Sequence, residues 1–272
     1  MSSRRAEDTK TVMDATTRIV RGIREVLLPL AILIGLSTTI NFVRQVLTIT
    51  AHAASGQTTP SAIEAERHHV LLLQNSQVRV FALTLPPGAQ SFVKHEHNYL
   101  TVQLEDHEVI MWKDGESPIQ HFHLPVGGIH FFLGGSAQGI RNDTNSEYRD
   151  VTIEFLDSQV TTYGYRHESG QYDYGPNVTG PPVDPEGHFV NSLNLEKAIA
   201  SDVQLLPRES LPAANGPQLL VAVTPLEFSA SSDHTITIRP GDVLWRKAGA
   251  AALPSASAKR MRLAVIEFSE TK

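Results

Sequence analysis

Two histidines separated by one residue, His95 and His97, are the side chains of this chain whose types and spacing best suit chemistry. On a β-strand, residues i and i+2 point to the same face of the sheet. Two imidazoles on one face have the arrangement needed to share a divalent metal ion. The spacing therefore predicts that the rings of His95 and His97 converge on one site.

The composition limits the chemistry available to such a site. The chain has no cysteine, which excludes disulfides, zinc-thiolate sites and thiol nucleophiles, so histidine, carboxylate, amide or hydroxyl groups must hold any metal. The formal net charge is −6, and no stripe of basic residues is present. Because phosphate binding requires clustered Lys and Arg, we expect no nucleic-acid partner. The sequence also lacks a nucleophile elbow, a phosphate-binding loop and a dinucleotide fingerprint.

The elements that must position the two histidines occur twice in the sequence. The first half has a glycine turn at Gly127 and closes on the apolar run 151–155, and the second half has a turn at Gly241 and closes on a matching run at 264–268. The second half is shorter before its turn and lacks the His-x-His pair. We therefore interpret it as a duplicate without the site.

Both halves consist of short runs rich in Val, Ile, Leu, Phe and Thr, separated by turns rich in Gly, Pro, Asn and Asp. Alternation within these runs predicts an all-β protein, an antiparallel sandwich or barrel. In one run the same alternation places Phe122 inside and sends His121 and His123 to the surface. Residues 193–205, between the halves, have a helix-like pattern instead.

The N-terminal part predicts export or membrane attachment. Residues 26–43 carry no charge, and Arg18, Arg21 and Arg24 precede them. Such a run is close to the roughly 20 apolar residues that span a bilayer, and the preceding basic residues favour a cytoplasmic N-terminus. Three interpretations stay open: an uncleaved signal anchor, a signal peptide cleaved near residues 51–53, and a buried helix of a soluble protein. The first two predict a bacterial cell-envelope protein, anchored in the inner membrane with a periplasmic domain, or exported.

The motifs around the histidines resemble those of the cupin superfamily. Gly88 precedes the His-x-His pair as in the first cupin motif, and the spacing of Gly127, Gly135 and Asn142 is similar to that of the second. Together with the repeat, this resemblance implies a bicupin, two tandem double-stranded β-helix or jelly-roll barrels preceded by an N-terminal hydrophobic helix. The expected organisation is a cytoplasmic basic segment at 1–25, a signal-anchor or signal-peptide helix at 26–49, a linker at 50–67, a first cupin domain at 68–160, a connection at 161–200 and a degenerate second cupin domain at 201–272.

Cupins typically hold a divalent metal with three histidines and one glutamate. In the family's register His95 and His97 fill two histidine positions, Gln138 stands at the third, and Tyr99 or Thr101 stands where the glutamate is expected. The resemblance therefore implies a degenerate metal site formed by His95, His97 and Gln138, in a ligand pocket shared with Tyr99 and Thr101. Iron, manganese, nickel or zinc is the metal it implies for the first barrel, and none is expected in the second.

Three functions follow from this incomplete ligand set. The first is a membrane-tethered or exported bicupin-like protein that binds a small ligand or a partner in the first barrel without catalysis. The second is a metal-dependent oxygenase or isomerase that uses the reduced His-His-Gln site. The third is a structural role as an interaction surface, with a homodimer as the expected assembly. The sequence leaves open whether the chain is an enzyme.

Overall fold

The structure of the chain is a computed structural model that describes residues 59–115, 120–161, 177–178, 189–231 and 234–269. Residues Gln57–Lys272 form one compact unit. The basic segment predicted at 1–25, the hydrophobic helix predicted at 26–49 and the first half of the linker predicted at 50–67 lie outside the described residues. In the described ranges, no helix has the length and apolar character that a membrane crossing requires.

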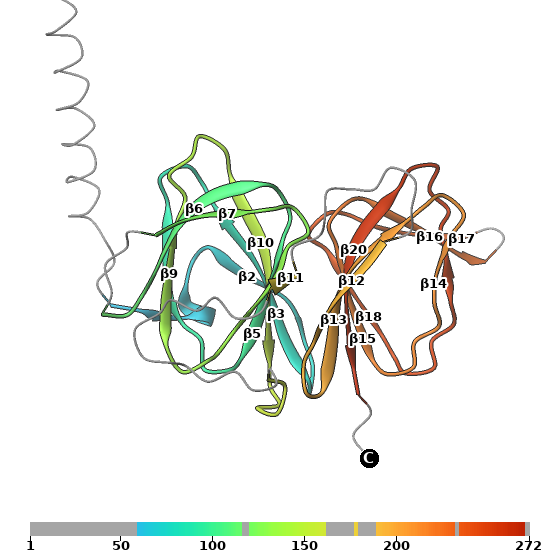
Figure 1. Ribbon diagram of the computed structural model, residues 1–272, viewed down its shortest axis with the longest axis horizontal. Helices are drawn as coiled ribbons and strands as arrows, with labels where there is room; N and C mark the ends of the chain where they lie inside the picture. Colours follow the sequence, from blue (N-terminus) through green and yellow to red (C-terminus); the bar gives the residue numbers. More distant parts are fainter. Residues whose placement is uncertain (1–58, 116–119, 162–176, 179–188, 232–233, 270–272) are drawn as a thin grey trace, which may run out of the picture. The chain divides into compact units, whose positions relative to one another are not determined.

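The first half of this unit forms two sheets that face each other around a common interior (Figure 1). One sheet has the order β1-β4-β9-β6-β7, with β1 (Ser61–Ala62), β4 (Gln90–Lys94), β9 (Ala137–Arg141), β6 (His107–Lys113) and β7 (Gln120–Leu124). The other has the order β11-β8-β5-β10-β3-β2, with β11 (Asn177–Val178), β8 (Ile129–Phe132), β5 (Tyr99–Gln103), β10 (Tyr148–Phe155), β3 (Val78–Leu85) and β2 (His69–Gln74). A short 3-10 helix, η1 (Ile63–Ala65), precedes β2. We call these two sheets the first barrel.

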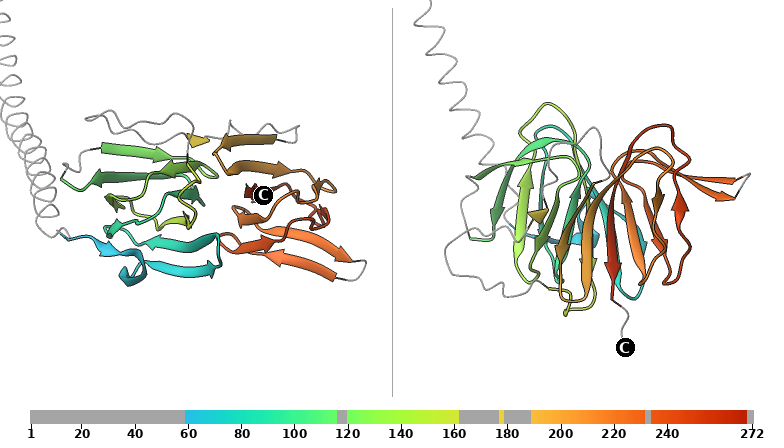
Figure 2. Two further views of the ribbon diagram at one scale, coloured as in Figure 1. Left: turned by 90° about the horizontal axis from the view of Figure 1, so that it is seen from below. Right: turned by 45° about the vertical axis from the view of Figure 1, so that its right-hand side comes forward.

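The second half forms a five-stranded sheet and two shorter strand pairs, which we call the second barrel. The sheet has the order β12-β13-β20-β15-β18, with β12 (Phe189–Asn194), β13 (Ala198–Leu205), β20 (Met261–Phe268), β15 (Gln218–Ala222) and β18 (Val243–Arg246). The pairs are β14 (Ser210–Leu211) with β19 (Leu253–Pro254), and β16 (Leu226–Ser231) with β17 (His234–Ile238). Two further views show the strands of the two halves next to each other (Figure 2).

The two barrels repeat one pattern of strand pairing. In the first, β10 lies between β3 and β5, and Phe155 pairs with Val78. In the second, β20 lies between β13 and β15, and Phe268 pairs with Ala198. The prediction of an all-β protein is confirmed, and the repeat seen in the sequence is a repeat of strand pairing.

The helix predicted at 193–205 is wrong. The segment contains the end of β12, a bend at Glu196 and Lys197, and the whole of β13. Within β13 the exposed Ile199 (46%) lies between the buried Ala198 and Ala200, which is the two-residue period of a strand. The strands on either side of the bend pair with each other, and this pairing satisfies the backbone groups that a helix would have bonded internally.

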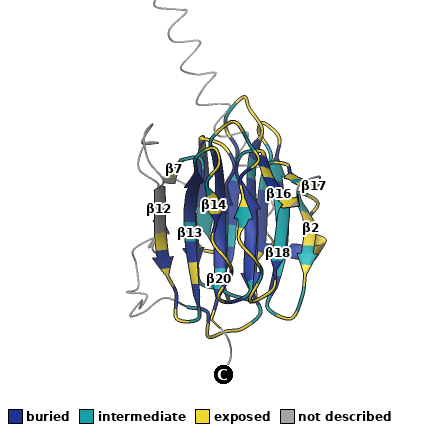
Figure 3. Ribbon diagram, turned by 90° about the vertical axis from the view of Figure 1, so that its right-hand side faces the viewer, coloured by how far each residue is buried: buried dark blue, intermediate teal, exposed yellow. Residues whose placement is uncertain are grey.

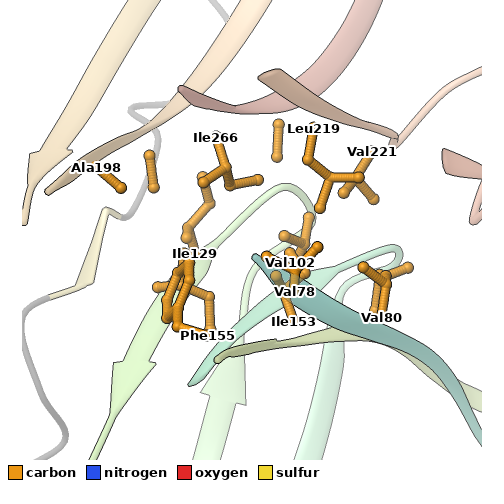
Figure 4. Close-up of a cluster of buried hydrophobic side chains, with 14 of the residues drawn as sticks. Val78, Val80, Val102, Ile129, Ile153, Phe155, Ala198, Leu219, Val221 and Ile266 are labelled. Atoms are coloured by element: carbon orange, nitrogen blue, oxygen red, sulfur yellow. The ribbon is translucent and has the colours of Figure 1, made fainter. Parts of the chain in front are cut away.

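One hydrophobic core joins the two barrels (Figure 4). On one side it contains Ile153 and Phe155 of β10, and on the other Ile266 and Phe268 of β20, all buried. The rings of Phe155 and Phe268 meet edge to face with centroids 6.1 Å apart. Colouring by burial shows β13 and β20 largely buried (Figure 3). Both strands have one face in the shared core and the other inside the second barrel.

The faces that β10 and β20 turn into their own barrels differ sharply in polarity. From β20 the second barrel receives Met261, Leu263 and Val265, which join an apolar interior cluster. At the corresponding positions β10 has Tyr148, Asp150 and Thr152, all buried, and its buried Glu154 corresponds to Glu267 of β20. Strand pairing thus gives the barrels the same frame, and at three of these positions the first barrel has Tyr148, Asp150 and Thr152 where the second has Met261, Leu263 and Val265.

We predict that the Phe268→Ala substitution lowers the free energy of unfolding of the whole unit by about 3 to 5 kcal/mol, because it leaves a void in the core that both barrels share. Ile199→Ala, on the exposed side of β13, serves as the control and is expected to change stability by less than about 1 kcal/mol. Urea denaturation followed by tryptophan fluorescence and circular dichroism measures both. Two separate transitions in the wild-type chain, with Phe268→Ala moving only one, would contradict a shared core.

Candidate functional site

A cavity of about 40 Å³ lies inside the first barrel. Strand pairing assembles one side of it, because Leu83 of β3 pairs with both His69 of β2 and Asp150 of β10, while Asp150 also pairs with Gln103 of β5. The opposite sheet contributes Ser91 of β4. The cavity has room for about three water molecules, since each needs about 10 to 15 Å³.

The carboxylate of Asp150 is the most unusual group at this cavity. It is 2% exposed, and it accepts hydrogen bonds from the Tyr148 hydroxyl (2.7 Å) and the Thr152 hydroxyl (3.1 Å). Burial raises its pKa from 3.8 to about 6, although the hydrogen bond from Tyr148 and the charge of His69 act in the opposite direction. Burial and the charge of Asp150 also raise the pKa of Tyr148 well above its usual value, so the tyrosine keeps its proton and donates.

His95 is linked to the protein surface through two charged groups. Its Nδ1 lies 3.1 Å from Glu154 Oε1, and Arg79 Nη2 donates to Glu154 Oε2 at 2.7 Å. Burial tends to raise the pKa of Glu154, but the hydrogen bonds from His95 and Arg79 and the charge of Arg79 outweigh it and lower the pKa. Burial lowers the pKa of His95 despite the neighbouring carboxylate, so the ring is neutral near pH 7. Because an ionised carboxylate only accepts hydrogen bonds, the His95 proton resides on Nδ1 and Nε2 carries a lone pair.

His69 is held in a similar way on the other side of the cavity. Its Nδ1 lies 2.8 Å from Glu66 Oε2, and its side chain is 3% exposed. Burial tends to raise the pKa of Glu66, but hydrogen bonds from His69 and from the His68 backbone lower it overall. The ionised Glu66 therefore orients the His69 ring with a proton on Nδ1, leaving Nε2 as the ring nitrogen for further contacts.

Several polar atoms at the cavity have no protein partner. Ser91 Oγ and Gln103 Oε1 are buried without a hydrogen bond in the described part of the chain, and both residues are 1% exposed. His130 of β8 is also buried at the cavity, and burial lowers its pKa from 6.5 to about 4, so the ring is neutral near pH 7. Leaving a buried polar atom unpaired costs about 1 to 3 kcal/mol, which a bound molecule with matching groups would recover.

Comparison with known proteins finds similarity in structure alone. No protein-family model matches the sequence, and no curated protein matches it. AerE from Microcystis aeruginosa is similar with a TM-score of 0.55 and 13% identity, over 78% of this chain and 98% of that one. Salicylate 1,2-dioxygenase from Pseudoaminobacter salicylatoxidans gives 0.53 and 14%, over 81% and 78%, and a cupin 2 conserved barrel domain protein from Leptotrichia buccalis gives 0.50 and 10%, over 78% and 92%.

The chain has the fold of the cupin superfamily. At these identities the likeness concerns the fold alone.

The structure places four of the five pocket residues expected from the cupin motifs at the cavity. His95, Tyr99, Thr101 and Gln138 line the cavity, and His97 is not among its lining residues. The Tyr99 ring stacks on His95 with centroids 3.8 Å apart, and its hydroxyl donates to Gln138 Oε1. The cupin motif therefore brings four of its five expected residues to one place.

The position of His97 follows from the local backbone. β4 ends at Lys94, and a bend separates His95 from β5, so strand alternation does not apply to the His-x-His pair. The N–H of Gly135 donates to the His95 carbonyl at 2.8 Å, and that of Gly134 donates to Asn98 Oδ1 at 3.0 Å. A Cβ at Gly134 would lie 2.4 Å from the His97 carbonyl carbon, so only glycine allows this close approach.

The metal-ligand set of a typical cupin does not fit these side chains. Over the described ranges, no three His, Asp or Glu side chains are grouped so that they would hold a metal ion. Of the ligands expected from the motif, Gln138 already accepts the Tyr99 hydroxyl through its Oε1, and His97 does not line the cavity. The arrangement is better suited to hydrogen bonding than to coordination.

Motif analysis did not identify His69, His130 or Asp150 as site residues. All three line the cavity, but they come from three strands that lie far apart in the sequence. The available signal was a polar residue at every second position of an apolar strand, as at Asp150, Thr152 and Glu154 of β10. The second barrel lacks this signal, because Leu263 and Val265 stand at two of these positions.

We predict that Asp150→Asn stabilises the protein near neutral pH. Because the pKa of Asp150 is raised in the folded state, the contribution of this side chain to wild-type stability is fully present below about pH 4 and is lost as the pH rises through about 6. The variant has no such loss, so its advantage should grow across this window and level off at about 1 to 3 kcal/mol. Urea denaturation at a series of pH values measures the difference. An advantage that shrinks with rising pH would show instead that the ionised carboxylate is stabilised in the fold.

Proposed function

We propose that the chain is a bicupin whose first barrel binds a small polar ligand without catalysis. The observation that carries this proposal is the pair of unpartnered polar atoms, Ser91 Oγ and Gln103 Oε1, beside a cavity. Buried polar groups in proteins are nearly always hydrogen-bonded, and a site that leaves two unpaired gains free energy when a ligand supplies the partners. Water is the weakest ligand of this kind, and a molecule with donors and acceptors at fixed positions binds better.

The second barrel supports the proposal as an internal comparison. Strand pairing matches Gln103 and Thr101 of the first barrel with Ala222 and Leu220 of the second. An apolar interior is thus compatible with the same strand arrangement, so folding alone does not require polar residues inside the first barrel. Polar groups retained at a stability cost are a common property of binding sites.

The proposal includes a location outside the cytoplasm. The charge-free run at 26–43, preceded by Arg18, Arg21 and Arg24, supports an inner-membrane anchor or an export signal. The folded unit would then meet its ligand in the periplasm of a bacterium. A homodimer is part of the same proposal, supported by the edge position of β2 and by its exposed residues Val70 (60%) and Leu71 (51%).

We predict that Thr101→Leu abolishes ligand binding. It places in the cavity the residue that the second barrel has at this position, and the added volume displaces bound molecules. Isotope-labelled NMR spectra of the full chain, recorded with acetamide, glycerol, methylammonium and acetate in turn, should show saturable shifts at cavity residues in the wild type and none in the variant.

Thr237→Leu is the matched control for this experiment, because Thr237 is an exposed strand residue of the second barrel. It should leave every ligand-induced shift unchanged. If no probe perturbs the cavity residues of the wild type, or if Thr101→Leu responds like the wild type, the cavity is not a ligand site.

The metal-dependent oxygenase or isomerase built on His95, His97 and Gln138 is the alternative that the placement of His97 disfavours. After exposure to iron, manganese, nickel or zinc and removal of free metal, we expect the chain to retain well under one equivalent, with no difference between the wild type and His95→Gln. Elemental analysis by mass spectrometry measures this. One equivalent of metal that His95→Gln loses would favour the enzyme.

A further inference from the structure

The carboxylate of Asp150 is buried and forms no ion pair with any residue that the structure describes. Its two hydrogen bonds come from the neutral hydroxyls of Tyr148 and Thr152. No Lys, Arg or His side chain in the described ranges forms an ion pair with it, whereas the buried Asp202 of the second barrel is paired with Arg262 at 2.7 Å. A buried charge without a counterion is costly, and it attracts any small cation that reaches it.

The other polar atoms around the cavity are mostly hydrogen-bond acceptors. Gln103 Oε1 is an unpaired carbonyl oxygen, and the carboxylate of Glu154 fixes the proton of the neutral His95 ring on Nδ1, so that its Nε2 is an acceptor. Ser91 supplies a hydroxyl that donates or accepts. An anion would meet the Asp150 charge and these lone pairs, whereas a molecule rich in N–H groups would satisfy them.

We propose that the cavity of the first barrel selects a small protonated primary amine, whose ammonium group is held by Asp150 and donates to the surrounding acceptors. This inference rests on the proposed ligand-binding function and adds the chemical class of the ligand. The cavity of about 40 Å³ admits an ammonium head group with a short carbon chain. The aromatic rings of Tyr99, Phe132 and Tyr148 also line it, and cations are attracted to aromatic faces.

The test compares three probes that differ in charge and in N–H groups. Thermal unfolding of the full chain is followed near pH 7.5 with methylammonium chloride, potassium chloride or acetamide, each at about 100 mM. Methylammonium is expected to raise the unfolding temperature by about 3 °C, and more than either other probe. Potassium carries the charge without N–H groups, and acetamide carries N–H groups without the charge.

Asp150→Asn is the decisive variant. Asparagine keeps the size of the side chain and bonds both hydroxyls as acceptor and donor, and it should remove the methylammonium shift while leaving the variant folded without ligand. Asp157→Asn is the control, because it removes one negative charge from an exposed position, and it should keep the full methylammonium-induced rise in unfolding temperature.

The pH dependence of the methylammonium-induced shift in unfolding temperature gives a second test in the wild type. Asp150 faces three titratable groups, Tyr148 on its own strand, His69 on β2 and His130 on β8. Protonation of Asp150 removes the negative charge, so the methylammonium shift should disappear by about pH 5. A shift that persists there, or that Asp150→Asn retains, overturns the amine assignment.

The outcomes separate this inference from the function on which it rests. If acetamide shifts the unfolding temperature and methylammonium does not, the first barrel binds small polar molecules and the amine assignment is wrong. If potassium matches methylammonium, the site recognises charge alone and the assignment is again wrong. If no probe changes the unfolding temperature or the NMR spectrum, both proposals fall together.

Discussion

The hydrogen bonds that Tyr148 and Thr152 donate to the buried carboxylate of Asp150 are the interaction on which the character of the first barrel depends. The two hydroxyls give each carboxylate oxygen one hydrogen bond but do not neutralise its charge. The site is therefore stable enough to persist in the fold and retains a charge that a ligand can neutralise. The second barrel has Met, Leu and Val at the same positions, and there they join an apolar cluster.

A single strand, β10, contributes side chains both to the shared core and to the cavity of the first barrel. One face of β10 contributes Val151, Ile153 and Phe155 to the core shared by the two barrels, and the other contributes Asp150 and Thr152 to the cavity. The apolar face of β10 packs against the second barrel in the shared core, so the polar face of this strand needs to contribute little to the stability of the fold.

The sequence predicted the parts of the structure that depend on an unbroken strand. Alternation along β7 placed His121 and His123 on the surface, and both are exposed, while Phe122 packs against the interior cluster. The same reasoning does not extend to His95 and His97, because β4 ends at Lys94.

The polar lining of the cavity was beyond prediction for a different reason. Both faces of β10 are buried, so its sequence alone does not tell which face points into the barrel. His69, His130 and Asp150 meet only through strand pairings between distant segments. The most direct test of this account is the ¹³C NMR titration of the Asp150 carboxyl carbon. We expect a midpoint near pH 6, as burial without a cation requires, and a midpoint below about 4 would show a carboxylate that is solvated or paired and would contradict the account.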